Sequence, residues 1–132
     1  RQEAAIDALS TPLIPMHAGV VLMPLVGDFD RGRIERLRHA LVQGIHEEGA
    51  RLTIIDITGI SMFDPELGRG LARVSAAARL LGATVVLTGV QPEIARGLAD
   101  AGERLSDVET RRTLQEGIDF ALNHLSHQKE GR

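Results

Sequence analysis

The sequence predicts a single α/β domain with a mostly parallel, five-stranded sheet and about four helices. The chain has 132 residues, a length that suits one compact domain. Strand-like segments alternate with segments of helical periodicity, which calls for parallel strands joined by right-handed crossovers. Residues 51–57 and 83–88 are almost continuously apolar, as expected for central strands that are covered on both faces.

Residues 1–26 are predicted to form the end of a helix followed by a β-hairpin. We expect residues 1–10 to be the last part of a linker helix from a longer protein, because the chain does not begin with methionine. Residues 12–17 and 19–26 are expected to pair as two strands. Pro24 cannot donate to a strand ladder, so the second strand should have an edge or a bulge there.

Three helices are expected between the strands. Asp30 is a good N-cap for the first, in which apolar residues recur at helical spacing up to a terminator at Gly49. The second begins at Asp64-Pro65-Glu66, which combines an N-cap, a first-turn proline and an acid facing the helix dipole, and it runs to about Leu81. Pro92 opens a short third helix.

The C-terminal part predicts one more strand and one more helix. Residues 105–110 are expected to form the last strand, and apolar residues from Leu114 to Leu125 mark the last helix. Polar residues 126–132 are expected to form a frayed tail. The expected domain therefore covers residues 11–125.

Composition excludes several classes of function. The net charge of -3 disfavours nucleic acid and anionic membranes as partners, and the three aromatic residues are too few for a base-stacking platform. Without cysteine, no disulfide framework or cysteine-ligated metal can form. No apolar run approaches the length of a membrane span, and no secretory signal is visible, so we expect a cytoplasmic protein.

Four stretches of the chain resemble one known family. In chain order they are residues 9–15 (LSTPLIP), 54–64 (IIDITGISMFD), 79–95 (RLLGATVVLTGVQPEIA) and 110–118 (TRRTLQEGI). Together with the predicted element order, they resemble the STAS domain of anti-sigma-factor antagonists. In particular, they look like the C-terminal half of RsbR-type stressosome proteins.

The resemblance implies a protein-interaction scaffold that regulates a partner-switching stress pathway, with no enzymatic activity and no cofactor. STAS domains of this type form oligomers and pack with an RsbS-type STAS protein into a large shell. That shell sequesters an RsbT-type serine/threonine kinase. In such proteins the start of the second helix and the preceding loop resemble a docking surface, which here points to Asp64, Pro65, Glu66, Arg69 and Arg73.

This chain departs from the family pattern at both phosphoacceptor positions. The family carries Ser or Thr directly after the Asp that starts the second helix, and this chain has Pro65 there. The second family position, on the short helix after the Pro-Glu pair, falls at or near Gly97. Ser61 in the preceding loop is an alternative phosphoacceptor. Glu66 places a negative charge near the same helix start, either as a phosphate mimic or simply to suit the helix dipole.

Other residue groups allow more than one interpretation. Acids at predicted strand ends (Asp28, Asp30, Asp56, Asp64) could hold Mg²⁺, but N-capping and loop contacts also explain them. The histidines lack the spacing of a zinc helix, so no metal site is predicted. Gly68 and Gly70 are unusual inside a helix and indicate close approach, either of a partner or of the sheet.

A second function stays open alongside the scaffold. The chain could be a ligand- or nucleotide-sensing regulatory STAS domain of a transporter-type protein, with the nucleotide at the loop before Asp64. A thermal shift with GTP or ATP would distinguish this function from a scaffold that only docks proteins.

Overall fold

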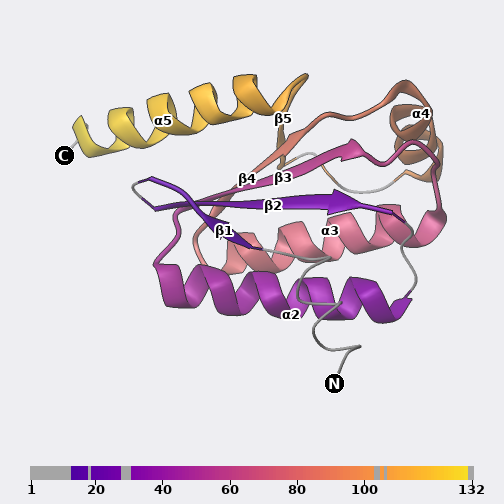
Figure 1. Cartoon of the computed structure of the whole chain (residues 1–132), viewed down its shortest axis with the longest axis horizontal. Coiled ribbons are helices and arrows are strands. Elements are labelled where there is room, and N and C mark those ends of the chain that lie inside the picture. The colour runs from indigo at the N-terminus through magenta and orange to yellow at the C-terminus, as the bar shows by residue number, and fades with distance from the viewer. Residues whose placement is uncertain (1–12, 18, 28–30, 103–104, 106, 131–132) are drawn as a thin grey trace.

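The computed structural model describes residues 13–17, 19–27, 31–102, 105 and 107–130. Within them the predicted alternation of strands and helices is present (Figure 1). The elements are β1 (Ile14–Pro15), β2 (Val20–Val26), α2 (Arg31–Glu48), β3 (Leu52–Gly59), α3 (Pro65–Leu80), β4 (Thr84–Thr88), α4 (Pro92–Ala101), β5 (Glu109–Arg111) and α5 (Leu114–Glu130).

The sheet has the strand order β1-β2-β3-β4-β5. β1 pairs antiparallel with β2, and the other neighbouring pairs are parallel. Each parallel crossover moves one strand in the same direction, so right-handed connections place α2, α3 and α4 on one face. The helix after the last strand, α5, covers the opposite face, as Figure 1 shows above the sheet.

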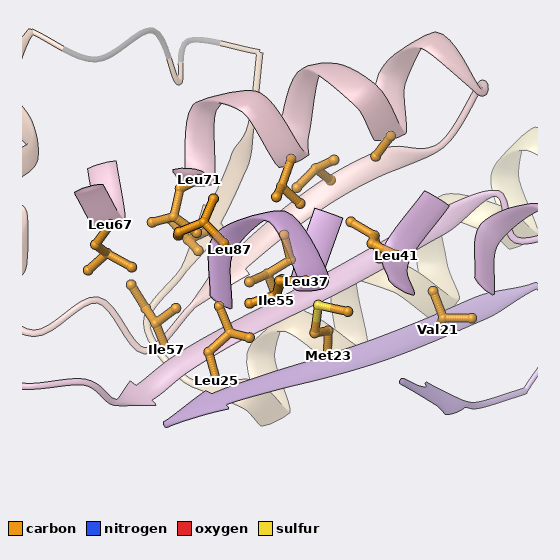
Figure 2. Packing of buried hydrophobic residues seen from close by; sticks show 14 of the residues in the cluster. Val21, Met23, Leu25, Leu37, Leu41, Ile55, Ile57, Leu67, Leu71 and Leu87 are labelled. Atoms are coloured by element: carbon orange, nitrogen blue, oxygen red, sulfur yellow. The ribbon is translucent and has the colours of Figure 1, made fainter. Parts of the chain in front are cut away.

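Both faces of the sheet are packed, because side chains alternate along each strand. On the α2 and α3 face, Met23, Ile55 and Leu87 meet buried residues of the two helices (Figure 2). On the other face, Leu22 and Ile54 belong to a second cluster with residues of α5. The expectation that β3 is a central, doubly covered strand is therefore confirmed.

Pro24 lies at a bulge and not at an edge. The register between β2 and β3 shifts between Pro24 and Val26, as the missing N–H predicted. β2 is nevertheless an inner strand, flanked by β1 and β3. Among the described residues, the two-residue β1 pairs with Val21 and Leu22 of β2, before the proline.

The bounds of β5 and α5 differ from those expected. β5 occupies only Glu109–Arg111, because pairing with β4 begins at Glu109; the predicted strand over 105–110 started too early. α5 continues to Glu130, past the expected end at Leu125 and through part of the expected frayed tail. The apolar stripe ends near Leu125, but a polar segment can extend a helix in solvent. The predicted linker helix over 1–10 and the N-cap Asp30 lie outside the described residues.

Candidate protein-docking site

The start of α3 is fixed by its own first residues. Asp64 has extended backbone angles (φ -134, ψ 135), and its carboxylate accepts a 2.7 Å hydrogen bond from the Glu66 N–H. Pro65 follows in the first turn, where a backbone N–H is not needed. Leu67 is buried and faces Ile57 of β3 in Figure 2, which ties this turn to the core. The predicted N-cap is therefore present.

Glu66 lies between arginines of two helices. Its carboxylate accepts a hydrogen bond from Arg69, one turn along α3, and its other oxygen is 3.7 Å from Nε of Arg31 in α2. The hydrogen bond from Arg69 holds the pKa of Glu66 below its ordinary value of 4.5; the charges of Arg69, Arg31 and Arg73 add to this, while desolvation opposes it. Glu66 is thus ionised at neutral pH, and its charge is paired with Arg31 and Arg69 of the same domain.

Arg69 and Arg73 both act on Glu66, so they share the face of α3 that also carries this acid. Arg69 engages Glu66 directly, whereas Arg73 is exposed one turn further along the helix. Arg73 is therefore the member of this pair that leaves more of its charge to solvent. The charged part of the site therefore combines the ionised, ion-paired Glu66 with the exposed guanidinium of Arg73.

The loop between β3 and α3 has one buried residue that anchors it to the core, and two exposed residues that follow. Ile60 is buried, and its N–H donates a 3.0 Å hydrogen bond to the Ile57 carbonyl. Ser61 and Met62 are exposed, Met62 by 80%. Residues of this loop, with Gly27, Gly59, Asp64 and Leu67, line a depression of about 290 Å³. Met62 thus adds an exposed apolar side chain to the rim of this depression, next to the half-buried Phe63.

The two family phosphoacceptor positions are not equivalent in the fold. Pro65 is exposed at the helix start, whereas Gly97 is half-buried in α4. The Phe63 ring occupies the space that a side chain at Gly97 would need. Ser61 lies in the exposed loop beside Pro65, so its hydroxyl is accessible.

The acids at the strand ends do not converge within the described residues. Asp56 accepts hydrogen bonds from the hydroxyls of Thr88 (2.6 Å) and Thr58 (3.0 Å). Asp64 is occupied as an N-cap. Asp28 and Asp30 lie outside the described residues. Among the residues the structure describes, no group of three or more His, Cys, Asp or Glu side chains could hold a metal ion.

The glycines of α3 serve contacts within the domain. A β-carbon on Gly70 would lie 2.2 Å from Cδ1 and 2.9 Å from Cγ2 of Ile34, so the missing side chain lets α2 and α3 approach closely. Gly68 is buried in the same helix. Of the two interpretations of Gly70, close packing is the one observed, and its neighbour is a helix and not the sheet.

Sequence reasoning missed three residues of this site: Arg31, Met62 and Phe63. Met62 had no clear signal in the sequence, because its neighbour Phe63 is also apolar and a single apolar residue in a loop is common. Arg31 and Phe63 had none, because their partners Glu66 and Gly97 lie on other elements.

Comparison with known proteins identifies the family. The STAS domain family matches residues 11–117. The chain is 40% identical over 121 residues to a protein of Bacillus subtilis (strain 168), "RsbT co-antagonist protein RsbRA", covering 92% of this chain and 44% of that protein. The chain thus spans less than half the length of this relative.

Two solved structures share the fold closely. A single-residue variant of RsbS from Moorella thermoacetica superposes with a TM-score of 0.77 at 25% identity, covering 86% of this chain and 98% of that one. A chain from "Molecular architecture of the stressosome, a signal integration and transduction hub" has a TM-score of 0.76 at 26% identity, covering 87% and 98%. In the part of the chain that the structure describes, no helix has the length and apolar composition to cross a membrane. From the family match and the shared five-stranded architecture, this chain belongs to the STAS domain family.

Proposed function

We propose that this chain is a protein-docking scaffold of a stressosome-like complex, without catalytic activity of its own. In this proposal it forms oligomers, packs with an RsbS-type STAS protein and sequesters an RsbT-type serine/threonine kinase, thereby regulating a partner-switching stress pathway. The similarity to RsbRA, whose name makes it a co-antagonist of RsbT, and to RsbS supports these partners. The similarity to a stressosome chain supports assembly.

The kinase-docking surface in this proposal consists of Met62, Asp64, Pro65, Glu66, Arg69 and Arg73. The observation that carries it is the exposure of Met62 (80%) directly beside a capped and ion-paired helix start. In this proposal Met62 supplies an apolar contact to the partner, and the fixed helix start limits the conformational entropy that the charged groups beside it lose on binding.

Control by phosphorylation would differ from the family pattern. Pro65 and Gly97 have no hydroxyl, so neither can accept a phosphoryl group. We propose Ser61 as the alternative acceptor, because it is exposed two residues before Phe63 and beside the docking surface. Glu66 is a poor phosphate mimic in this proposal, since Arg31 and Arg69 already meet its charge.

The test measures binding of the full-length protein to the RsbT-type kinase and RsbS-type protein encoded in the same genome, by calorimetry and light scattering. Met62→Asp should weaken kinase binding at least about tenfold, because it places a charge in an apolar contact. The matched control is Leu122→Asp, an exposed apolar residue of α5 on the opposite face of the sheet, which should leave kinase affinity unchanged.

Charge reversal gives a second comparison. Arg73→Glu should reduce kinase affinity, while Arg38→Glu, on the exposed side of α2, should not. A wild-type protein that stays monomeric with both partners and binds no kinase would refute the proposal. In that case, a thermal shift with GTP or ATP would indicate the ligand-sensing alternative. Phosphorylation at Ser61 is tested by mass spectrometry after incubation with kinase and ATP, with Ser61→Ala as the control.

A further inference from the structure

The ring of Phe63, in the loop before α3, lies on a glycine of α4. A β-carbon built on Gly97 would come within 2.2 Å of Cγ of Phe63 and within 2.4 and 2.5 Å of its Cδ atoms. These atoms belong to the base and sides of the ring, so a small rotation of the ring tip would not relieve the overlap. A side chain at position 97 and the present position of the Phe63 ring therefore exclude each other.

The helix beneath this ring is a firm support. Ile94 and Leu98 of α4 are buried in the same core that α2 and α3 share. The start of the helix is tied to the end of β3, because the Gln91 side-chain amide donates a 3.2 Å hydrogen bond to the Thr58 carbonyl. α4 is thus linked to both ends of the short loop: through Thr58 just before it and through Phe63 near its end.

Phe63 is the packed side chain in the exposed half of the loop. Ile60 is buried at one end, and Asp64 caps α3 at the other, but Ser61 and Met62 between them face solvent. Phe63 packs against the main core, with its ring on Gly97. Without this contact, residues 61–63 would have no packed side chain to fix them.

We propose that Phe63 is a positioning residue: seated on Gly97, it holds the loop so that Met62 and Asp64 are presented to the docked partner. It follows that α4 controls the docking surface, although it contributes no residue to it. Added volume at position 97 would displace Phe63 and loosen the loop. The role in docking rests on the proposed function, whereas the coupling between α4 and the loop does not.

Amide hydrogen exchange at Ile60 and Glu66, whose N–H groups are hydrogen-bonded at the two ends of this loop, tests the coupling without any partner. Gly97→Ala should raise exchange in this loop about tenfold or more, although alanine favours the helix itself. Phe63→Ala should do the same. In the Phe63→Ala background, Gly97→Ala should cause no further increase, because the ring it displaces is gone. Ala95→Thr, on the exposed side of α4, weakens helix propensity without touching Phe63 and should leave loop exchange unchanged.

Kinase affinity then tests positioning. Gly97→Ala should weaken kinase binding about tenfold while assembly with the RsbS-type protein and the circular dichroism spectrum stay as in the wild type. Unchanged loop exchange in Gly97→Ala, or an equal increase in both backgrounds, would overturn the coupling. If Gly97→Ala raises amide exchange at the loop but binds the kinase with wild-type affinity, the proposed positioning role of Phe63 is wrong. If the wild type binds no kinase, the proposed function fails, and the exchange measurements still decide the coupling.

Discussion

The hydroxyl of Thr88, at the end of β4, donates a 2.6 Å hydrogen bond to the carboxylate of Asp56 on β3. The two residues are 32 positions apart in the chain and are paired in the parallel register. The bond joins two inner strands of the sheet. Thr88 is fully buried and Asp56 is half-buried, so the hydrogen bond is partly shielded from water. The Thr58 hydroxyl, two residues further along β3, also donates to Asp56, so this carboxylate accepts hydrogen bonds from both strands.

Thr88→Val should lower the free energy of unfolding by about 1.5 kcal/mol. The substitution keeps the shape of the side chain but removes a donor to a charged acceptor, and the half-exposed position of Asp56 places the loss at the lower end of the usual range. Urea unfolding measures it. Thr84→Val, on the same face of the same strand, is the control and should change stability by less than about 0.5 kcal/mol. Equal effects at both positions would argue against the hydrogen bond.

Thr53→Val should raise the free energy of unfolding, in contrast to Thr88→Val. Thr53 is fully buried in β3, and its Oγ1 has no hydrogen-bond partner among the described residues. Valine has nearly the same shape and an equal preference for strands, so the change removes an unsatisfied polar atom. We expect the free energy of unfolding to increase by about 1 kcal/mol in the same urea experiment. A destabilised variant would show that this hydroxyl is satisfied in solution.

Gly70→Ala should destabilise the domain by about 1–2 kcal/mol. Alanine gains up to about 1 kcal/mol in helix propensity, but overpacking against Ile34 costs about 1–3 kcal/mol. The diagnostic comparison is the Ile34→Ala background, where the new methyl group has room. There Gly70→Ala should be neutral or stabilising. The same cost in both backgrounds would mean that Ile34 is not the obstacle.

Glu66→Gln should change the pH dependence of stability. The pKa of Glu66 is lowered in the folded state by the Arg69 hydrogen bond, so ionised Glu66 stabilises the fold above about pH 4.5 and loses this effect as pH falls through the folded pKa. The variant should therefore melt at a lower temperature than the wild type at pH 7. The difference should shrink as the pH falls below 4.5.

Salt provides the control for this prediction. Glu66 is partly exposed and paired with arginines, so 1 M NaCl should reduce the pH 7 difference in melting temperature. A difference that is independent of both pH and salt would show that glutamine acts through packing and not through charge.

Local rules explain why the elements were predictable. The start of α3 was predictable because Asp64, Pro65 and Glu66 act on backbone groups within one turn of themselves, so neighbouring residues contain all the information needed. The central position of β3 was predictable because burial on both faces leaves a continuous apolar segment. The predicted end of α5 was wrong because the last turns of this helix have polar residues, which continue a helix without extending an apolar stripe.

Residue patterns alone were enough to predict the α/β class, the order of the elements and the N-cap of α3, and they show that positions 65 and 97 have no hydroxyl group. Three contacts became visible only in the folded chain: Arg31 with Glu66, Thr88 with Asp56, and Phe63 with Gly97. The physical reason is that each of these contacts joins different elements. Such contacts depend on strand order, register and helix packing, and these are settled by the simultaneous burial of many side chains, not by any local pattern.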